Sequence, residues 1–214
     1  MSPTFEQLSL DGLSQRWRHR RHSWRHTSDG GFDPARYQTR PLPAAPARAF
    51  VTEHHYSSSW PATRLAFGLY DRATGPRGGA LVGVLALGVP MHATVLTGVF
   101  PQLAPYRSAL ELSRLVLLDS CEANSESFFI SKALHMAAAV GIRGILAHSD
   151  PHVRQRTTPS GNTEQYLPGH WGGCYQASNM SYLGKTRPRT LVMLPDGTIL
   201  YSGVRAGSGG VPTA

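Results

Sequence analysis

The chain has 214 residues, 41% of them hydrophobic, and a formal net charge of +8 at pH 7. This length favours one domain with a sizeable core, and no apolar run approaches the roughly 20 residues that a membrane span needs. Residues 1–13 lack the basic start and the apolar stretch of a secretory signal, so we expect a cytoplasmic protein.

The positive charge comes almost entirely from arginine, since only Lys132 and Lys185 of the 21 basic residues are lysines. A GC-rich genome would produce the same bias. Arginine also presents a planar fork that pairs with phosphate through two hydrogen bonds. The charge therefore favours a polyanionic partner over a role in solubility alone.

Residues 1–43 are predicted to form a basic arm and linker, ahead of a main domain at 44–205 and a flexible tail at 206–214. The arm interleaves basic residues with Trp17 and Trp24 and ends in a linker rich in glycine and proline. A solvated arm, disordered or helical, is one interpretation. The other is an arm that holds nucleic-acid phosphates, with the two tryptophans available for stacking. Its candidate DNA-binding residues are Arg16, Arg18, Arg20, Arg21 and Arg25.

From residue 44 onward the chain alternates between helix-like and strand-like patterns. We expect a short helix at 44–54, strands at 64–70, 80–89 and 109–118, and an extension of the sheet at 94–100.

The second half continues this alternation. Asn124 is the expected N-cap of a helix that ends at Val140, with Gly141 in the C′ position. The remaining elements are, in chain order, a buried strand at 144–149, a polar loop at 157–168, a short helix at 173–182, and a hairpin of 190–194 and 199–202.

This order predicts an α/β protein, with a mixed sheet covered by helices, because a strand–helix–strand crossover lies at its centre. The GNAT acyltransferase fold has the same order, so 44–205 is predicted to be a GNAT-like catalytic domain. In that fold two central parallel strands, here 109–118 and 143–149, splay apart between flanking helices. Substrates meet in the gap between the two strands.

Polar groups gather where these elements end, as binding and catalytic groups commonly do. His54, His55 and Tyr56 follow the first helix. A neutral imidazole can act as a general base or a metal ligand, and a phenol can donate a proton. A single histidine is more often structural, but two adjacent histidines followed by a tyrosine favour a functional role for one of them.

Arg114 precedes four aliphatic residues in a strand, where an unpaired charge is costly to bury. We expect it either to form an ion pair with Glu111 or Glu126, or to contact an anion or a substrate carbonyl.

Asp150 leaves the second central strand at its carboxyl end, where open α/β sheets bind their ligands. It can cap a turn, orient a base or bind a metal. Three-dimensional proximity could produce a non-haem metal site, although the chain has no H-x-x-x-H spacing. The candidate ligands are His54, His55, His148, Asp150, His170 and Cys174. Cys121 and Cys174 suit a reducing compartment, with one disulfide as the alternative.

Asn124, Ser125 and Ser127 lie at the start of the central helix, whose exposed amides attract anions, so they are the candidate cofactor-binding residues. GNAT enzymes place a Gln/Arg-x-x-Gly-x-Gly/Ala loop there to bind the pyrophosphate of CoA. This chain has Cys-Glu-Ala-Asn-Ser-Glu at 121–126, without glycine and with two acids. Acetyl-CoA is therefore a doubtful donor.

A series of short motifs, in order over roughly residues 44–205, resembles the phage Mom-type DNA modification proteins. The motifs are His-Tyr-Ser at 55–57 with Trp-Pro at 60–61, Leu-Glu-Leu-Ser-Arg at 110–114, Glu-Ser-Phe-Phe at 126–129, Ser-Asp-Pro at 149–151, Gly-His at 169–170 with Tyr-Gln-Ala at 175–177, Tyr-Leu-Gly at 182–184, Pro-Arg-Thr-Leu at 188–191 and Leu-Pro-Asp-Gly at 194–197. The basic arm lies outside the resemblance.

The resemblance implies an enzyme that converts the N6 amine of adenine in double-stranded DNA to a carbamoylmethyl (glycinamide-like) amine, which protects phage DNA from host restriction. It places function on His55, Tyr56, Arg114, Ser127, Asp150 and Tyr175. It also implies bound iron, with His55 and Asp150 as candidate ligands, and a small or aminoacyl-type donor. The host cytoplasm is then the expected location, no membrane partner is expected, and the oligomeric state stays open, a dimer included.

Two other functions stay open. One is a GNAT N-acyltransferase that modifies a small-molecule or protein amine with acetyl-CoA, which predicts acetyl-CoA binding. The other is a DNA-binding or toxin-like module without chemistry, in which the arm carries all function. Deletion of residues 1–43 should leave an enzyme with its site intact and reduce mainly its affinity.

Overall fold

The computed structural model of the chain describes residues 13–157, 160–167, 169–170, 172–186, 192–193 and 199–200. The chain divides into two compact units, Met1–Met180 and Ser181–Ala214. In the second unit β10 (Val192–Met193) pairs antiparallel with β11 (Ile199–Leu200), which confirms the centre of the predicted hairpin. The expected tail at 206–214 lies outside the described residues. Within the described part of the chain, no helix combines the length and hydrophobicity needed to cross a bilayer.

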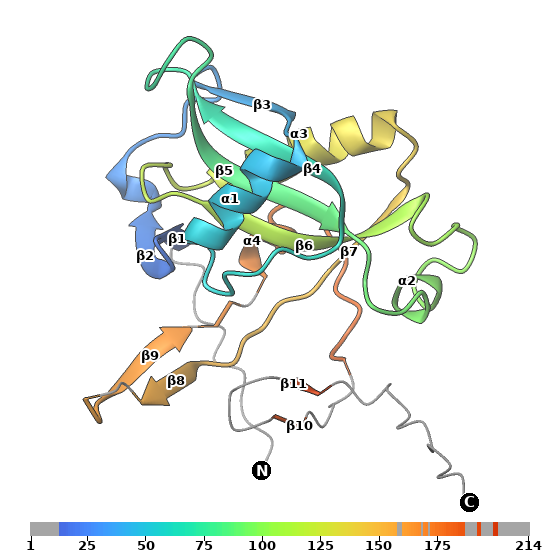
Figure 1. Ribbon diagram of the computed structural model, residues 1–214. Helices are drawn as coiled ribbons and strands as arrows, with labels where there is room; N and C mark the ends of the chain where they lie inside the picture. Colours follow the sequence, from blue (N-terminus) through green and yellow to red (C-terminus); the bar gives the residue numbers. More distant parts are fainter. Residues whose placement is uncertain are drawn as a thin grey trace, which may run out of the picture. The chain divides into compact units, whose positions relative to one another are not determined.

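A five-stranded mixed sheet forms the centre of the first unit, in the order β3-β4-β5-β6-β7 (Figure 1). Its strands are β3 (Tyr37–Pro41), β4 (Thr63–Asp71), β5 (Ala80–Gly88), β6 (Ala109–Leu117) and β7 (Gly144–Ala147). Neighbouring strands are antiparallel except β6 and β7, which are parallel and are connected by helix α3 (Ser125–Ala139). The predicted mixed sheet with a central strand–helix–strand crossover is confirmed.

Helices cover both faces of this sheet because its central strands are apolar on both sides. On one face α1 (Ala44–His54) packs on β4, β5 and β6, and on the other α3 packs on β3, β4 and β5. The buried residues of α1 follow the i, i+3, i+4, i+7 spacing of an amphipathic helix: Ala47, Phe50, Val51 and His54. The bounds of α1 are those that the sequence predicted.

The N-terminal segment differs from the predicted arm, because it folds into the first unit. Strands β1 (Leu13–Arg18) and β2 (Arg21–His26) form an antiparallel hairpin, followed by the short helix η1 (Thr27–Asp29). The two turn residues, His19 and Arg20, have φ of 47° and 65°, a conformation that asparagine and glycine usually supply. The turn sits on the end of α1, where the backbone N–H of Arg20 donates to the carbonyl of His54 at 2.9 Å. Strand β3 follows, so the predicted boundary at 43/44 falls inside the unit.

Three shorter segments also differ from the predictions. Residues 94–100 contain the helical turn α2 (Thr94–Thr97) instead of a strand, because burial of Leu96 outweighs the strand preference of its β-branched neighbours. The polar loop at 157–168 is part of a second hairpin, formed by β8 (Arg154–Thr157) and β9 (Thr163–Leu167). The helix expected at 173–182 is the single turn α4 (Gly173–Gln176).

Candidate active site

The site forms where β6 and β7 separate. Strand β7 pairs only with residues 109–112 of β6, whereas β6 continues to Leu117. The second half of β6 therefore borders an opening beside the end of β7.

A β-bulge in β6 turns Arg114 toward this opening. Relative to β5, β6 contains one extra residue at Ser113. The side chains that pack into the core beneath α3 are Leu110 and Leu112 before the bulge and Leu115 after it. Even-numbered residues of β6 therefore face this core before the bulge, and odd-numbered residues face it after the bulge. Without the bulge Arg114 would follow Leu112 into that core, whereas with it Arg114 lies on the opposite face.

A cleft of about 600 Å³ occupies the opening, a volume typical of small-molecule sites. Its walls come from β1, the loop after α1, β6 beyond the bulge, the first turn of α3, and α4 with its preceding segment. Nine of the candidate catalytic, cofactor-binding and metal-binding residues line it, namely His55, Tyr56, Arg114, Asn124, Ser127, His148, His170, Cys174 and Tyr175. Three others, His54, Ser125 and Asp150, do not.

His55 is buried, with 6% of its surface exposed, and it is neutral near pH 7. Burial, assisted by the nearby cation of Arg114, lowers the pKa of His55 to about 3. Its Nδ1 accepts a hydrogen bond from the backbone N–H of Ser57 at 3.2 Å, so the neutral ring carries its proton on Nε2. The imidazole therefore offers an N–H donor and is too weakly basic to serve as the general base.

Trp17 of β1 backs the His55–Tyr56 pair. Its ring centroid lies 5.0 Å from that of Tyr56 and 6.2 Å from that of His55, within the range of favourable aromatic pairs. Trp17 is only 6% exposed, so it is a wall of the cleft and is not available to DNA. The sequence carried a signal for this position, since Leu13, Gln15 and Trp17 alternate along one face of a strand.

Arg114 is held by three hydrogen bonds to neutral oxygens. Its Nε and Nη2 donate to the carbonyl and hydroxyl of Ser59 at 3.1 and 2.7 Å, and its Nη1 donates to the carbonyl of Ser113 at 2.6 Å. None of the ion pairs among the described residues includes Arg114, so the predicted pair with Glu111 or Glu126 does not form. Burial lowers the pKa of the guanidinium, yet it stays charged. A half-buried cation without a carboxylate partner suits an anion or a carbonyl in the cleft.

The start of α3 is filled by Arg16 of β1. This side chain is fully buried and forms an ion pair with Glu126. It also donates to the carbonyl of Cys121 at 3.1 Å and to the hydroxyl of Ser125 at 3.0 Å. Arg16, predicted to contact DNA, is instead internal, since its whole donor fork is used inside the protein.

The three candidate cofactor-binding residues are separated by this packing. Ser125 is fully buried, and its hydroxyl donates to the carbonyl of Glu122 at 2.6 Å. Asn124 and Ser127 line the cleft, with the Ser127 hydroxyl donating to the Asn124 carbonyl at 3.0 Å. Only these two can meet a ligand in the cleft.

Asp150 lies behind His170, which lines the cleft. The backbone N–H of His170 donates to the Asp150 carbonyl at 2.8 Å, and an Asp150 carboxylate oxygen accepts from the His152 backbone at 3.2 Å. Burial lowers the pKa of His170, while the Asp150 charge opposes this shift. His170 was predicted only as one of several metal ligands, but the structure makes it the cleft histidine with an acidic neighbour.

The thiols and the phenol of the site stay protonated. Cys121 and Cys174 are free, without a disulfide, and burial raises the pKa of each to about 12. Neither thiol is therefore ionised enough to act as a free nucleophile at neutral pH. Burial also raises the pKa of Tyr175, whose ring lies edge-on to His170 with centroids 6.2 Å apart.

One group of three metal-binding side chains occurs among the described residues, namely His19, Glu53 and His54, with ligand atoms within 4.8 Å of one another. However, Nδ1 of His54 accepts from the His19 backbone N–H at 3.2 Å. Its Nε2 therefore carries the proton, which fits a hydrogen-bonded cluster better than a metal site. His55 and Asp150, the implied iron ligands, belong to no such group in the described part of the chain.

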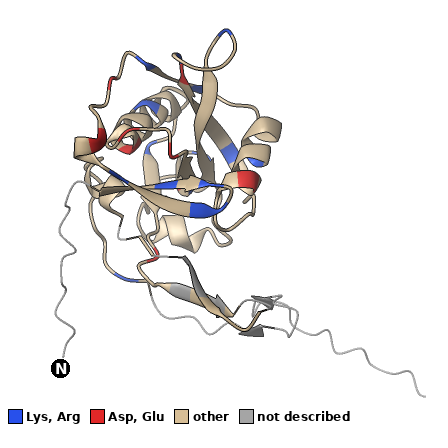
Figure 2. Cartoon of the chain, turned by 90° about the vertical axis from the view of Figure 1, so that its left-hand side faces the viewer, with Lys and Arg blue, Asp and Glu red and all other residues tan. Residues whose placement is uncertain are grey.

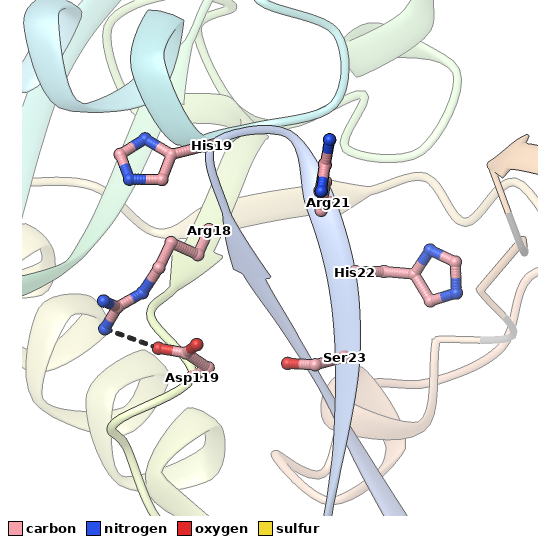
Figure 3. Close-up of a pocket in the computed structure, with 6 residues that line it drawn as sticks. All are labelled: Arg18, His19, Arg21, His22, Ser23 and Asp119. Atoms are coloured by element: carbon pink, nitrogen blue, oxygen red, sulfur yellow. Dashed lines mark ion pairs between the residues drawn. The ribbon is translucent and has the colours of Figure 1, made fainter.

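The remaining arginines of the hairpin are only partly available to a partner. Arg18 forms an ion pair with Asp119 at 2.6 Å (Figure 3). The Nε of Arg25 donates to the Asp119 carbonyl at 2.7 Å. Beside them lies a hollow of about 440 Å³, lined by Arg18, His19, Arg21, His22, Ser23 and Asp119. In Figure 2 the side of the molecule that carries the hairpin faces the viewer, and basic segments lie across it.

A sequence profile of the Mom protein family matches residues 36–203, more than three quarters of the chain. The match covers the five-stranded sheet and every cleft residue outside β1, whereas the β1–β2 hairpin precedes it. No curated protein matches the chain significantly.

Proposed function

The chain belongs to the Mom protein family, which is associated with phage DNA modification, and we propose that it is the enzyme that converts the N6 amine of adenine in DNA to a carbamoylmethyl amine. The observation that carries this proposal is the single cleft in which His55, Tyr56, Arg114 and Tyr175 meet.

In the proposed reaction adenine N6 forms a bond to the methylene carbon of the donor. N6 loses one proton, and the donor's leaving group departs with the electrons of the broken bond. The adenine must leave the duplex stack to be reached. A cleft of about 600 Å³ suits one base together with a small donor.

The aromatic walls hold the base. We assign the stacking of the base to Tyr56, backed by Trp17, and to Tyr175, because both phenol rings line the cleft, and Tyr175 keeps its hydroxyl proton for donation. Arg114 holds the carbonyl or carboxylate of the donor, and the Nε2–H of His55 donates to the same group. Both roles follow from a half-buried cation and a neutral N–H donor that line one cleft.

His170 accepts the proton that leaves N6 on its Nε2, which in this step gives up the long hydrogen bond, 3.4 Å, that it accepts from the backbone N–H of Asp150. It is neutral, it lines the cleft, and the adjacent Asp150 stabilises the charged ring once the proton is transferred. Asp150 is then a positioning residue behind the base. Asn124 and Ser127, at the start of α3, orient the donor.

We further propose a GNAT-like fold without CoA chemistry. The β6–α3–β7 crossover, with parallel strands that pair over four residues, supports the fold. The Arg16–Glu126 pair fills the start of α3, where GNAT enzymes bind the pyrophosphate, which supports a small or aminoacyl-type donor. Isothermal titration with acetyl-CoA tests the rival N-acyltransferase, which requires binding.

Nucleoside mass analysis of plasmid DNA from expressing cells tests the reaction itself. The wild type should yield deoxyadenosine heavier by one carbamoylmethyl group, and this DNA should resist restriction enzymes. Arg114→Gln and His170→Gln should abolish the heavier nucleoside, whereas Met91→Ala, at an exposed loop position, should retain it. Unmodified DNA from folded wild type that binds acetyl-CoA would overturn the proposal.

A further inference from the structure

We propose that the β1–β2 hairpin carries a base-stacking surface, with Trp24 at its outer end, that binds unpaired bases of nucleic acid beside the cleft. The inference rests on the proposed function in taking DNA as the substrate. It concerns residues that precede the region matched to the family.

The two faces of the hairpin have different chemistry. Cross-strand partners share a face, and the register places Gln15 with Trp24 and Trp17 with His22 on one of them. The opposite face carries the side chains that attach the hairpin to residues 119–126, namely Arg16, Arg18 and Arg25. In Figure 3 the neighbouring side chains of His22 and Ser23 point to opposite sides of β2.

The first face forms a continuous line of rings from the cleft to solvent. Centroids lie 5.0 Å apart between Tyr56 and Trp17, 6.1 Å between Trp17 and His22, and 6.4 Å between His22 and Trp24. Along the hairpin exposure rises from Trp17, which is 6% exposed, through the half-buried His22 to Trp24, which is 50% exposed. The inner rings are fixed by packing, while the outer indole presents a large apolar surface to solvent.

The charge of the hairpin identifies the occupant of this surface. Residues 13–26 contain five arginines and three histidines but no acid. Arg20 and Arg21 are exposed at the turn end of the hairpin, next to the basic hollow. Exposed aromatic rings beside cations form the usual platform for single-stranded nucleic acid, where bases stack and phosphates pair.

Unpaired bases fit this surface better than a duplex does. In a duplex the faces of the bases are already stacked on one another, so only an opened strand can offer them to Trp24. An enzyme that extrudes adenine creates such a strand next to its cleft. The stacking surface would therefore hold a nucleotide adjacent to the extruded one.

The test compares binding of three fluorescent probes of equal length by anisotropy: a single strand, an abasic single strand with the same phosphates, and a duplex. Wild type should bind the single strand more tightly than the abasic strand. Trp24→Ala should weaken single-strand binding by roughly 5- to 150-fold, to the abasic level, and Trp24→Phe should retain most of the affinity. Because the indole is half exposed, neither substitution should disturb folding, and Met91→Ala is the matched surface control.

Equal wild-type affinity for the normal and abasic strands, or unchanged affinity in Trp24→Ala, would overturn the stacking surface. Nucleoside mass analysis of the DNA distinguishes a wrong assignment of the stacking surface from a wrong assignment of the reaction. Modified DNA without base-dependent binding refutes only the surface. Base-dependent binding that requires Trp24, with unmodified DNA, supports the surface and counts against the reaction.

Discussion

Replacement of Arg16 by methionine should destabilise the protein more than any other change in the hairpin. The substitution keeps much of the side-chain volume but removes the charge partner of Glu126, which is only 9% exposed. It also removes the donor to the buried hydroxyl of Ser125 and to the carbonyl of Cys121. Breaking a buried ion pair from one side costs about 3–5 kcal/mol, a large part of the roughly 5–15 kcal/mol that stabilises a typical protein.

Urea unfolding followed by tryptophan fluorescence would measure this loss, and thermal unfolding should show a fall in Tm of about 6 to 20 °C. The matched control is Arg18→Met, because Arg18 pairs with Asp119 at the surface, with 49% and 38% of the two side chains exposed. Exposed pairs contribute about 0–1 kcal/mol.

A second variant isolates the cause of the loss. Arg16→Met combined with Glu126→Leu should regain much of the stability, because no buried charge is then left without a partner. If Arg16→Met loses no more stability than Arg18→Met, the anchoring role assigned to Arg16 is refuted.

Three further substitutions test other contacts. His55 is neutral in the folded protein down to about pH 3, whereas the unfolded chain protonates this histidine near pH 6.5, so the free energy of unfolding of the wild type should fall between these two pH values. Urea titrations across this range should show a smaller fall for His55→Gln, and an equal fall in both proteins would contradict the buried neutral state of His55. The Arg36 hydrogen bond lowers the pKa of Asp71 to about 2, so its contribution is present above the unfolded pKa near 3.8 and is lost as the pH falls through about 2. Asp71→Asn should therefore lower the free energy of unfolding by about 2 kcal/mol at pH 7. It should also make stability less dependent on pH below pH 4, and a pH dependence equal to that of the wild type would refute this assignment. Gly88→Ala would place a Cβ 2.5 Å from the Ser113 hydroxyl and 2.6 Å from the Ala62 carbonyl, so we expect about 1–3 kcal/mol of destabilisation. It should also weaken DNA modification by displacing the bulge, and wild-type stability and modification would contradict these contacts.

The apolar pattern of the sequence was sufficient to locate α1 and the central strands, because their buried residues recur at helical or strand spacing. The hairpin was missed because its turn has neither glycine nor asparagine and its inner face contains Arg16. From the sequence alone an arginine at that position is expected to face solvent, because its ion-pair partner Glu126 lies 110 residues away along the chain. The cleft residues were largely predictable, since they follow the ends of regular elements.

The direction of Arg114 could not be predicted from its own strand. It depends on the extra residue at Ser113 relative to β5, and a register difference of this kind exists only between two paired strands. For the same reason, the use of Arg18 and Arg25 in holding the hairpin to Asp119 was not visible in a run of basic residues.

Attachment of the hairpin to the sheet has a consequence for attempts to trim the protein. Removal of residues 1–43 would take away the edge strand β3 and the Trp17 wall, and it would leave Glu126 without its counter-charge. Such a truncation cannot separate DNA affinity from chemistry, because both would fail through unfolding. The smallest functional unit therefore includes the β1–β2 hairpin, which precedes the segment matched to the family. A transfer of the matched segment between genomes would have to include this hairpin as well.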